Sequence, residues 1–158
     1  MNRRVLAIAL AINVVCATGF AQRIDFSGTW RLDREASTII TAEGLAGLGE
    51  PAPENLHVTH AANGGLLLSS RVNGAQPRAY LVEGGSTVPA PGGGTMLVAT
   101  RWRNGALVSE GSARVDGNTV GIREVMTLSA DGRTLTLEVT TTSPSGAETN
   151  TLVYRKAG

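Results

Sequence analysis

The sequence has one cysteine, one lysine and few aromatic residues, and neither sign of charge is in large excess. The single cysteine is Cys16, close to the amino terminus. The rest of the chain has no cysteine and so can form no disulfide and no cysteine-ligated metal site. Basic and acidic side chains number 14 and 13, which gives a net charge of +1. A nucleic-acid-binding protein needs a basic surface that neutralises phosphates, and this composition does not favour one. We therefore expect no nucleic-acid partner.

The chain opens with a basic and then an apolar segment. Arg3 and Arg4 precede an apolar run with a single polar interruption at Asn13. A positive end, an apolar core and small residues before a cleavage site are the order typical of a secretory signal peptide. The run from Val5 to Ala21 has 17 residues, fewer than the about 20 that cross a bilayer. We expect residues 1–21 to be a signal peptide, so that the mature chain has no transmembrane segment.

The position of Cys16 leaves a second interpretation of the amino terminus open. Bacterial lipoproteins are cut directly before a lipid-modified cysteine that follows a small residue, whereas Val15 precedes Cys16 here. We therefore expect cleavage after Ala21 and an exported, periplasmic or extracellular domain over residues 22–158, with a lipid anchor at Cys16 as the alternative. Loss of Arg3 and Arg4 leaves 12 basic and 13 acidic side chains, a net charge of −1.

The mature chain consists of short runs rich in Val, Leu and Thr, separated by Gly, Asn or Asp. Such partly alternating runs with regularly spaced turn residues indicate antiparallel β-strands. Ser37 to Gly47 lacks alternation and predicts one short helix, and Gly84 to Gly94 predicts a loop rich in Pro and Gly. The expected strands are Phe26–Leu32, Leu56–Ala61, Leu66–Val72, Arg78–Glu83, Thr95–Arg103, Ala106–Val115, Thr119–Ser129, Thr134–Thr142 and Glu148–Lys156.

The connections between these strands determine the expected topology. Most are too short for a crossover helix, so neighbouring strands are expected to pair antiparallel in an up-and-down meander. An open sheet of this size would expose two edges and one apolar face, whereas closure removes the edges and buries that face. We predict an all-β barrel of about eight or nine strands, with a two-sheet sandwich as the alternative.

The first strand carries a family resemblance. The segment Phe26-Ser27-Gly28-Thr29-Trp30 contains a Gly-x-Trp that resembles the first-strand signature of lipocalins and the wider calycin group. With the signal peptide, the hairpin that follows Trp102 and the terminal Thr151–Lys156, the chain resembles small secreted bacterial lipocalin-like proteins, a family largely without assigned activity. The resemblance covers most of the mature chain and implies a barrel that binds a small ligand without catalysis.

The resemblance also implies structural roles for three residues. In lipocalins the first-strand Trp closes one end of the barrel, and an Arg near the last strand stacks over its ring. Gly28 and Trp30 match the signature, and Arg155 is the candidate for the stacked Arg. Arg31, Arg101 and Arg103 are further candidates. The chain departs from typical lipocalins in having no disulfide and few aromatic residues.

Alternation along the expected strands predicts which side chains face the interior. An interior carboxylate without a partner would cost several kcal/mol, so Glu124 needs either a partner or a position at the rim; an internal ion pair with an Arg would satisfy it. In the functional interpretation, polar side chains anchor a ligand inside an apolar pocket. The expected ligand-binding residues are Glu124, His60, Tyr154, Met126 and Trp102. The other inward positions are Leu56, Val58, Leu66, Leu68, Ser70, Met96, Val98, Thr100, Leu107, Ser109, Ile122, Leu128, Leu135, Leu137, Val139 and Leu152.

Cofactor, metal and catalytic motifs give little support to other functions. His57 and His60 are three apart on one expected strand and so face opposite sides, which prevents them from sharing a metal. We expect no metal, no cofactor and no enzyme activity. An enzyme would need an inward acid–base pair, such as Glu124 with His60 or Tyr154.

Two functional hypotheses follow. The first is an exported barrel that binds a small apolar or amphipathic molecule. The second is a cell-envelope accessory domain with a solid core, which acts through protein contacts of its loops Ser37–Pro53 and Gly84–Gly94. The sequence identifies no protein partner.

Overall fold

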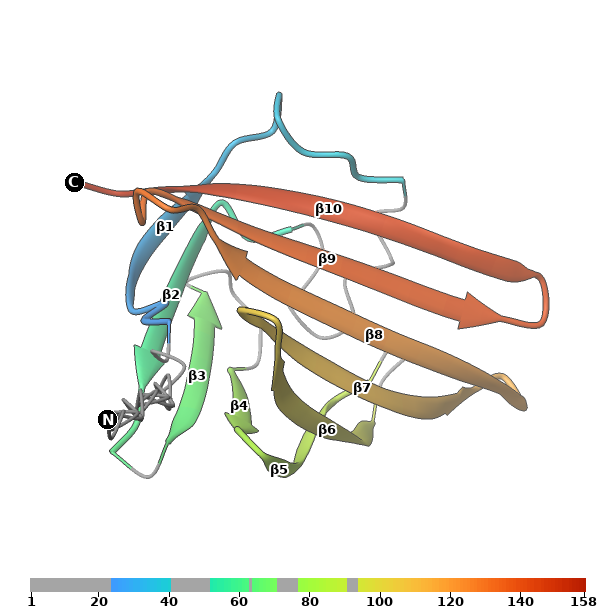
Figure 1. The fold of residues 1–158 in the computed structure, drawn as a ribbon. Helices are drawn as coiled ribbons and strands as arrows, with labels where there is room; N and C mark the ends of the chain where they lie inside the picture. Colours follow the sequence, from blue (N-terminus) through green and yellow to red (C-terminus); the bar gives the residue numbers. More distant parts are fainter. Residues whose placement is uncertain (1–23, 41–51, 63, 71–76, 91–93) are drawn as a thin grey trace, which may run out of the picture.

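The computed structural model describes residues 24–40, 52–62, 64–70, 77–90 and 94–158, which form an all-β antiparallel structure (Figure 1). The described part of the chain has no helix that is long and apolar enough to span a lipid bilayer. Its ten strands are β1 (Gly28–Leu32), β2 (Asn55–His60), β3 (Gly65–Ser70), β4 (Arg78–Leu81), β5 (Gly84–Pro89), β6 (Thr95–Arg103), β7 (Ala106–Val115), β8 (Asn118–Leu128), β9 (Thr134–Ser143) and β10 (Gly146–Lys156).

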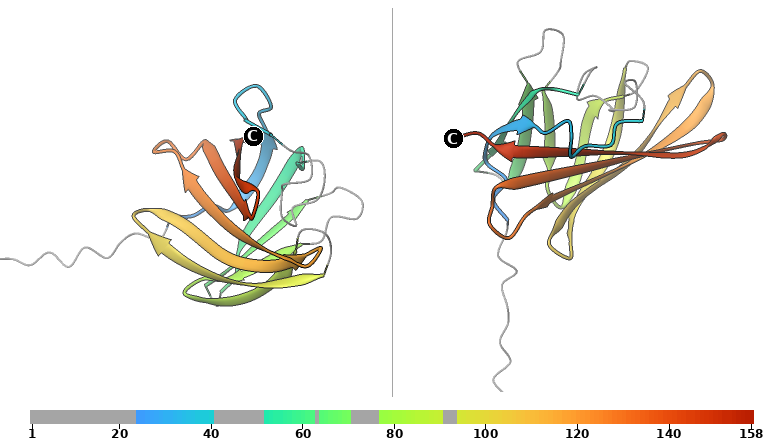
Figure 2. Two further views of the ribbon diagram at one scale, coloured as in Figure 1. Left: turned by 90° about the vertical axis from the view of Figure 1, so that its right-hand side faces the viewer. Right: turned by 90° about the horizontal axis from the view of Figure 1, so that it is seen from above.

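The strands follow one another as a meander that joins the first strand to the last. The order in the sheet is β4-β3-β2-β1-β10-β9-β8-β7-β6-β5, and every ladder is antiparallel. In the ladder between β1 and β10, Trp30 lies opposite Lys156 and Leu32 opposite Tyr154. The strands therefore curve around a common interior (Figure 2). The predicted meander and its closure into a barrel are confirmed.

The barrel is nearly closed, because β4 and β5 end the order without a ladder between them. Single contacts connect this seam instead. The amide of Leu81 in β4 donates to Ser86 Oγ in β5 at 2.5 Å. Glu83 lies between the two strands and extends the pairing of β5 with β6, because its amide donates to the carbonyl of Thr100 at 2.8 Å. Glu83, at a φ of 61°, also accepts the amide N–H of Trp102 through its carboxylate at 2.9 Å. Glu83, directly before the start of β5, thus satisfies backbone groups of Thr100 and Trp102 in β6.

Two details differ from the sequence prediction. The expected loop Gly84–Gly94 contains β5, whose Val88 is buried, so the described residues form ten strands rather than the expected eight or nine. Residues 37–40 of the expected helix form no helix; Thr38 pairs with Thr151 of β10 as an isolated bridge. The rest of that segment, residues 41–51, and the expected signal peptide with Cys16 lie outside the described residues.

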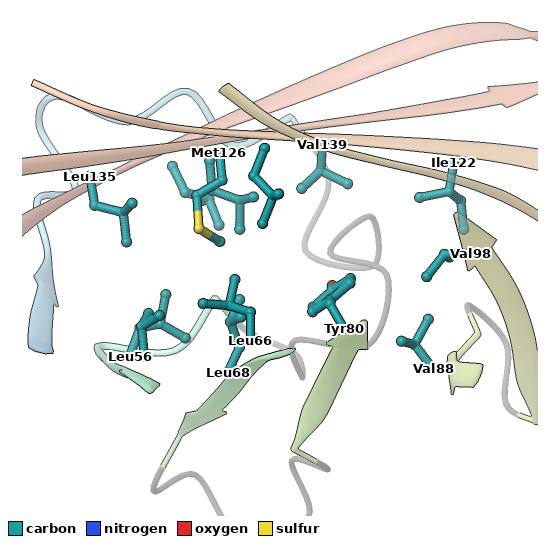
Figure 3. Packing of buried hydrophobic residues seen from close by; sticks show 14 of the residues in the cluster. Leu56, Leu66, Leu68, Tyr80, Val88, Val98, Ile122, Met126, Leu135 and Val139 are labelled. Carbon is teal, nitrogen blue, oxygen red and sulfur yellow. The ribbon is translucent and has the colours of Figure 1, made fainter. Parts of the chain in front are cut away.

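Alternating side chains from nearly every strand fill the interior. Side chains of β8 and β9, such as Met126 and Val139, face those of β2, β3 and β4, such as Leu56 and Leu66 (Figure 3). Most of the inward positions predicted from alternation are buried. His60, Ser70, Trp102 and Leu128 are only partly buried, because they lie at or near strand ends. The buried ones are Leu56, Val58, Leu66, Leu68, Met96, Val98, Thr100, Leu107, Ser109, Ile122, Glu124, Met126, Leu135, Leu137, Val139, Leu152 and Tyr154.

The close approach of β6 and β7 depends on Gly111. A Cβ at this position would lie 2.5 Å from the carbonyl oxygen of Leu97 and 2.8 Å from Cγ1 of Val98. The neighbouring strand carries a second glycine, Gly121, where a Cβ would meet nothing closer than 3.8 Å. The two glycines therefore have different roles, although both lie inside strands.

We predict that Gly111→Ala lowers the stability of the barrel, because the new methyl group must displace backbone of β6. Overpacking of this kind costs about 1–3 kcal/mol, which thermal unfolding followed by circular dichroism would detect. Gly121→Ala is the matched control and should leave the Tm unchanged or raise it slightly, because glycine is unfavourable inside a strand. Equal Tm values for the two variants would contradict the assigned close approach.

Candidate functional site

A cluster of buried polar side chains lies inside the barrel. Glu124 is 4% exposed and lies between the buried Ile122 and Met126 on β8. One carboxylate oxygen accepts a hydrogen bond from Nη1 of Arg78, and the other accepts one from the hydroxyl of Tyr80 at 2.6 Å. Arg78 is 1% exposed, so both charges of this ion pair are removed from water.

The pairing of strands explains how this cluster forms. Arg78 and Tyr80 alternate with exposed residues on the short strand β4, so both side chains point to the interior. β4 pairs with β3 and β8 with β7 and β9, and closure of the barrel brings the inner faces of β4 and β8 together. The guanidinium of Arg78 also lies 5.4 Å from the centre of the Tyr80 ring. Arg78, Tyr80 and Glu124 therefore form a cluster joined across the barrel.

Two buried hydroxyl groups continue the polar surface across the inner face of the sheet. Thr100 of β6, Ser109 of β7 and Glu124 of β8 lie opposite one another in successive ladders. The hydroxyls of Thr100 and Ser109 are 2.8 Å apart and share a hydrogen bond. We call Arg78, Tyr80, Thr100, Ser109 and Glu124 the polar belt. Its members come from four strands and are surrounded by mainly aliphatic side chains.

A small internal cavity adjoins the polar belt. Its volume is about 10 Å³, about the space that one water molecule requires. Tyr80, Ser109 and Glu124 contribute polar groups to its wall. Figure 3 shows Leu66 and Tyr80 on one side of the barrel and Met126 on the opposite side. The full lining is Leu66, Tyr80, Leu107, Ser109, Glu124, Met126 and Leu137.

Several buried polar atoms have no hydrogen-bond partner within the described residues. They include Nε and Nη2 of Arg78 and the hydroxyl of Tyr154. Such groups are rare in folded proteins because each has lost its bonds to water. Burial raises the pKa of Tyr154, and the nearby Glu54 carboxylate adds to this increase. Burial also raises the pKa of Tyr80 well above its ordinary value, with a further increase from the Glu124 charge.

A second group of the predicted site residues lies at one end of the barrel. Phe26, which precedes β1, is fully buried and its ring lies nearly parallel to two others: Trp102 at a centroid distance of 5.7 Å and His60 at 6.2 Å. His60 also accepts the amide N–H of Phe26 through Nε2 at 3.2 Å. His60 and Trp102 thus bind Phe26 rather than Glu124, and we call these three rings the ring stack.

Trp30 lies next to the ring stack and is fully buried. Its indole N–H donates to the carbonyl of Phe26 at 2.9 Å. Lys156, rather than the expected Arg155, lies over its ring, with Nζ 5.4 Å from the centre. The reason is strand alternation: Lys156 is the ladder partner of Trp30, whereas Arg155 points outward and pairs with Asp33 at 2.9 Å. Gly28, at a φ of 143°, leaves room for Lys156, because a Cβ there would lie 3.3 Å from its Cε.

The structure therefore separates the five predicted ligand-binding residues. Glu124 and Met126 line the internal cavity, whereas His60 and Trp102 belong to the ring stack. Tyr154 is buried on β10 with its hydroxyl unpartnered among the described residues. The acid–base pair that an enzyme would need does not form with Glu124, whose carboxylate bonds Arg78 and Tyr80 instead.

Sequence reasoning missed Arg78 and Tyr80. The strand Arg78–Glu83 was expected, but its inward side chains were not assigned because Arg, Tyr and Val alternate there with Ala, Leu and Glu, a pattern without a clear apolar face. The signal that could have found Arg78 is the inward carboxylate at Glu124, which requires a buried cation, and Arg78 shares the face of its strand with an aromatic residue.

The polar belt can hold and orient a polar group within an apolar interior. It offers the N–H groups of Arg78 and the hydroxyl of Ser109, while both oxygens of Glu124 are already bonded to protein donors. The geometry suits binding, since polar contacts in an apolar pocket fix the orientation of small molecules.

Solved structures provide the comparison that identifies this architecture, whereas no protein-family model and no curated protein matches the chain. Zebrafish ileal bile acid-binding protein complexed with cholic acid matches with a TM-score of 0.55 at 13% identity, over 84% of this chain and 98% of that chain. The fold is that of a calycin-type β-barrel. Fatty-acid-binding protein 1 of Echinococcus granulosus gives a TM-score of 0.54 at 15% identity, over 84% and 98% of the two chains. Lipid binding protein 8 of Caenorhabditis elegans in its apo form gives a TM-score of 0.58 at 17% identity, over 84% of this chain and 95% of that chain.

We predict that breaking the buried ion pair destabilises the protein more than removing it completely. Glu124→Leu or Arg78→Met alone leaves one unpaired charge in the interior, which costs about 3–5 kcal/mol. The double variant Arg78→Met with Glu124→Leu leaves no charge behind and should lose much less than the sum of the two single costs. Urea unfolding of all three variants measures this coupling.

The exposed pair of Arg123 and Glu110, with an N–O distance of 3.2 Å, is the control. Its side chains are more than half exposed, and Glu110→Ala should change stability by less than about 1 kcal/mol. Additive effects of the two buried substitutions would show that Arg78 and Glu124 do not interact as the structure indicates.

We predict that the tyrosines of the folded protein do not ionise near pH 10. The chain has two, Tyr80 and Tyr154, and the pKa of each is raised above the ordinary value of 10.0. The unfolded chain releases these protons near pH 10 and the folded chain does not, so stability is retained below that pH and falls as the pH rises above it. The phenolate absorbance, measured with and without denaturant, tests this; two normal titrations in the native protein would contradict it.

Proposed function

We propose that this protein is an exported, non-catalytic β-barrel that binds a small amphipathic molecule in its interior. The observation that carries the proposal is the polar belt: buried polar groups from four strands lie within an otherwise aliphatic barrel. Burial of an ion pair is a weak source of stability, because desolvation offsets most of the attraction. Core packing alone therefore does not explain why these polar groups are buried, whereas a role in holding a ligand does.

The similar solved structures support a ligand of this kind. Their titles name a bile acid-binding protein with cholic acid, a fatty-acid-binding protein and a lipid binding protein. At 13–17% identity these structures share the fold, and the inference that this barrel also takes an amphipathic molecule comes from its own interior. Apolar side chains would hold the ligand's chain, and the polar belt would hold its head group.

Residue roles follow from the geometry of the cavity. Glu124, Tyr80 and Ser109 form the polar side of the proposed site, and Met126 and Leu66 form its apolar side. Met126 is the most adaptable of these residues, because its side chain is unbranched and flexible. The ring stack of Phe26, His60 and Trp102 is proposed to close one end of the barrel rather than contact the ligand.

The small volume of the internal cavity supports a second candidate function. At about 10 Å³, the cavity does not hold a lipid unless side chains around it move. A barrel that stays filled would fit a solid accessory domain of the cell envelope that binds another protein. β5 is part of the barrel wall, and Thr38 pairs with Thr151 of β10, which leaves less of the two expected loops for such contacts.

Export and the form of the amino terminus are part of the proposal. The signal-peptide pattern of residues 1–21 supports cleavage after Ala21, and a lipid anchor at Cys16 is the alternative. The mass of the protein purified from its own cells distinguishes a chain that begins at Gln22 from one that carries lipid on Cys16.

We predict saturable binding of an apolar fluorescent dye such as Nile red by the delipidated mature protein, with displacement by long-chain amphiphiles. Met126→Trp should weaken this binding by about tenfold or more, because a larger side chain fills the proposed site. Glu138→Gln, on the exposed face of β9, is the control and should bind as the wild type does. Absence of saturable binding to the folded wild type would contradict ligand binding and favour the accessory domain.

A further inference from the structure

The guanidinium of Arg78 forms hydrogen bonds on one side only. Its Nη1 donates to Glu124, whereas Nε and Nη2 have no hydrogen-bond partner among the residues that the structure describes. These two atoms form one edge of the planar group, where two N–H bonds point in nearly the same direction. The side chain is 1% exposed, so this edge is a pair of buried donors that require an acceptor.

The charge of the polar belt is already balanced. Glu124 supplies one negative charge for the one positive charge of Arg78. Tyr80, Thr100 and Ser109 are uncharged, and the raised pKa of Tyr80 keeps its hydroxyl protonated at neutral pH. Any charged group added to the belt would therefore leave a net charge in a low-dielectric interior, which is costly.

We propose that the free edge of Arg78 binds an uncharged acceptor, the carbonyl oxygen of an amide, ester or ketone, and that Glu124 selects against carboxylates. This inference rests on the proposed function and specifies the head group of its ligand. It extends the proposed site beyond the cavity wall to Arg78, which bonds the cavity-lining Glu124 but does not itself line the cavity. A carbonyl oxygen has two lone pairs and can accept both N–H bonds without adding charge.

A carboxylate ligand, unlike a carbonyl group, adds negative charge to the polar belt. It would place a second negative charge on the guanidinium that Glu124 already neutralises. Two carboxylates that share one site repel, so one of them would have to bind a proton. Glu124 is fixed by both Arg78 and Tyr80, and the ligand is therefore the one that is excluded.

A set of probes with the same chain and different head groups tests the proposal. Dodecanamide, methyl dodecanoate, dodecanoate and dodecane compete against Nile red on the wild-type mature protein at neutral pH. We expect the amide and the ester to bind at least about tenfold more tightly than dodecanoate and more tightly than dodecane. In Glu124→Gln, Arg78 keeps its charge without a carboxylate partner, so dodecanoate should gain about tenfold or more and become the preferred ligand.

Glu138→Gln is the matched control. It makes the same chemical change on the outside of β9 and should preserve the wild-type order of affinities. If dodecanoate binds the wild type as tightly as dodecanamide does, selection by Glu124 is overturned. If dodecane binds as tightly as dodecanamide does, recognition of the head group is overturned. Either result leaves the proposed function in place.

Failure of all four probes to displace the dye would overturn both the inference and the proposed function. The wild-type order of affinities decides the inference by itself if Glu124→Gln does not fold. That order confirms the inference only if the amide and the ester both bind more tightly than dodecanoate and dodecane.

Discussion

The ion pair between Arg78 and Glu124 connects the weakest part of the barrel to one of its longest strands. β4 has four residues and forms a ladder with β3 alone, while its other side meets β5 through isolated contacts. The pair ties β4 to the inner face of β8, across the interior rather than along the sheet. The position of Tyr80, the enclosure of the internal cavity and the balance of buried charge all depend on this interaction.

Much of the fold could be predicted because strand alternation and turn residues are local signals. The runs that end at Asn104-Gly105 and Asp116-Gly117 form hairpins as expected, and alternation correctly placed Glu124 inside the barrel. β5 was missed because its short run is bordered by glycines and prolines that are typical of a loop. Whether residues 37–40 form a helix or run along β10 depends on contacts such as Thr38 N–H to Thr151 O, whose residues lie far apart in the sequence.

The candidate site was harder to predict than the fold, because it depends on which strands meet across the interior. His60, Trp102 and Glu124 share inward parity, but the structure divides them between the ring stack and the polar belt. Likewise, Lys156 rather than Arg155 lies over Trp30, since a shift of one residue along a strand moves a side chain to the opposite face. Alternation alone predicts whether a side chain points into or out of the barrel, but it does not predict which side chains it contacts there.

The ladder between β1 and β10 also sets the order of events during folding. Arg155 meets Asp33 across a separation of 122 residues, and Ala157 donates its amide to the carbonyl of Thr29. The ribosome makes β10 after every other strand, so β1 waits with one edge unpaired until synthesis of this strand is finished. Long-range pairing of this kind slows folding. The barrel can therefore close only once the strand nearest the carboxyl terminus is available to pair with β1.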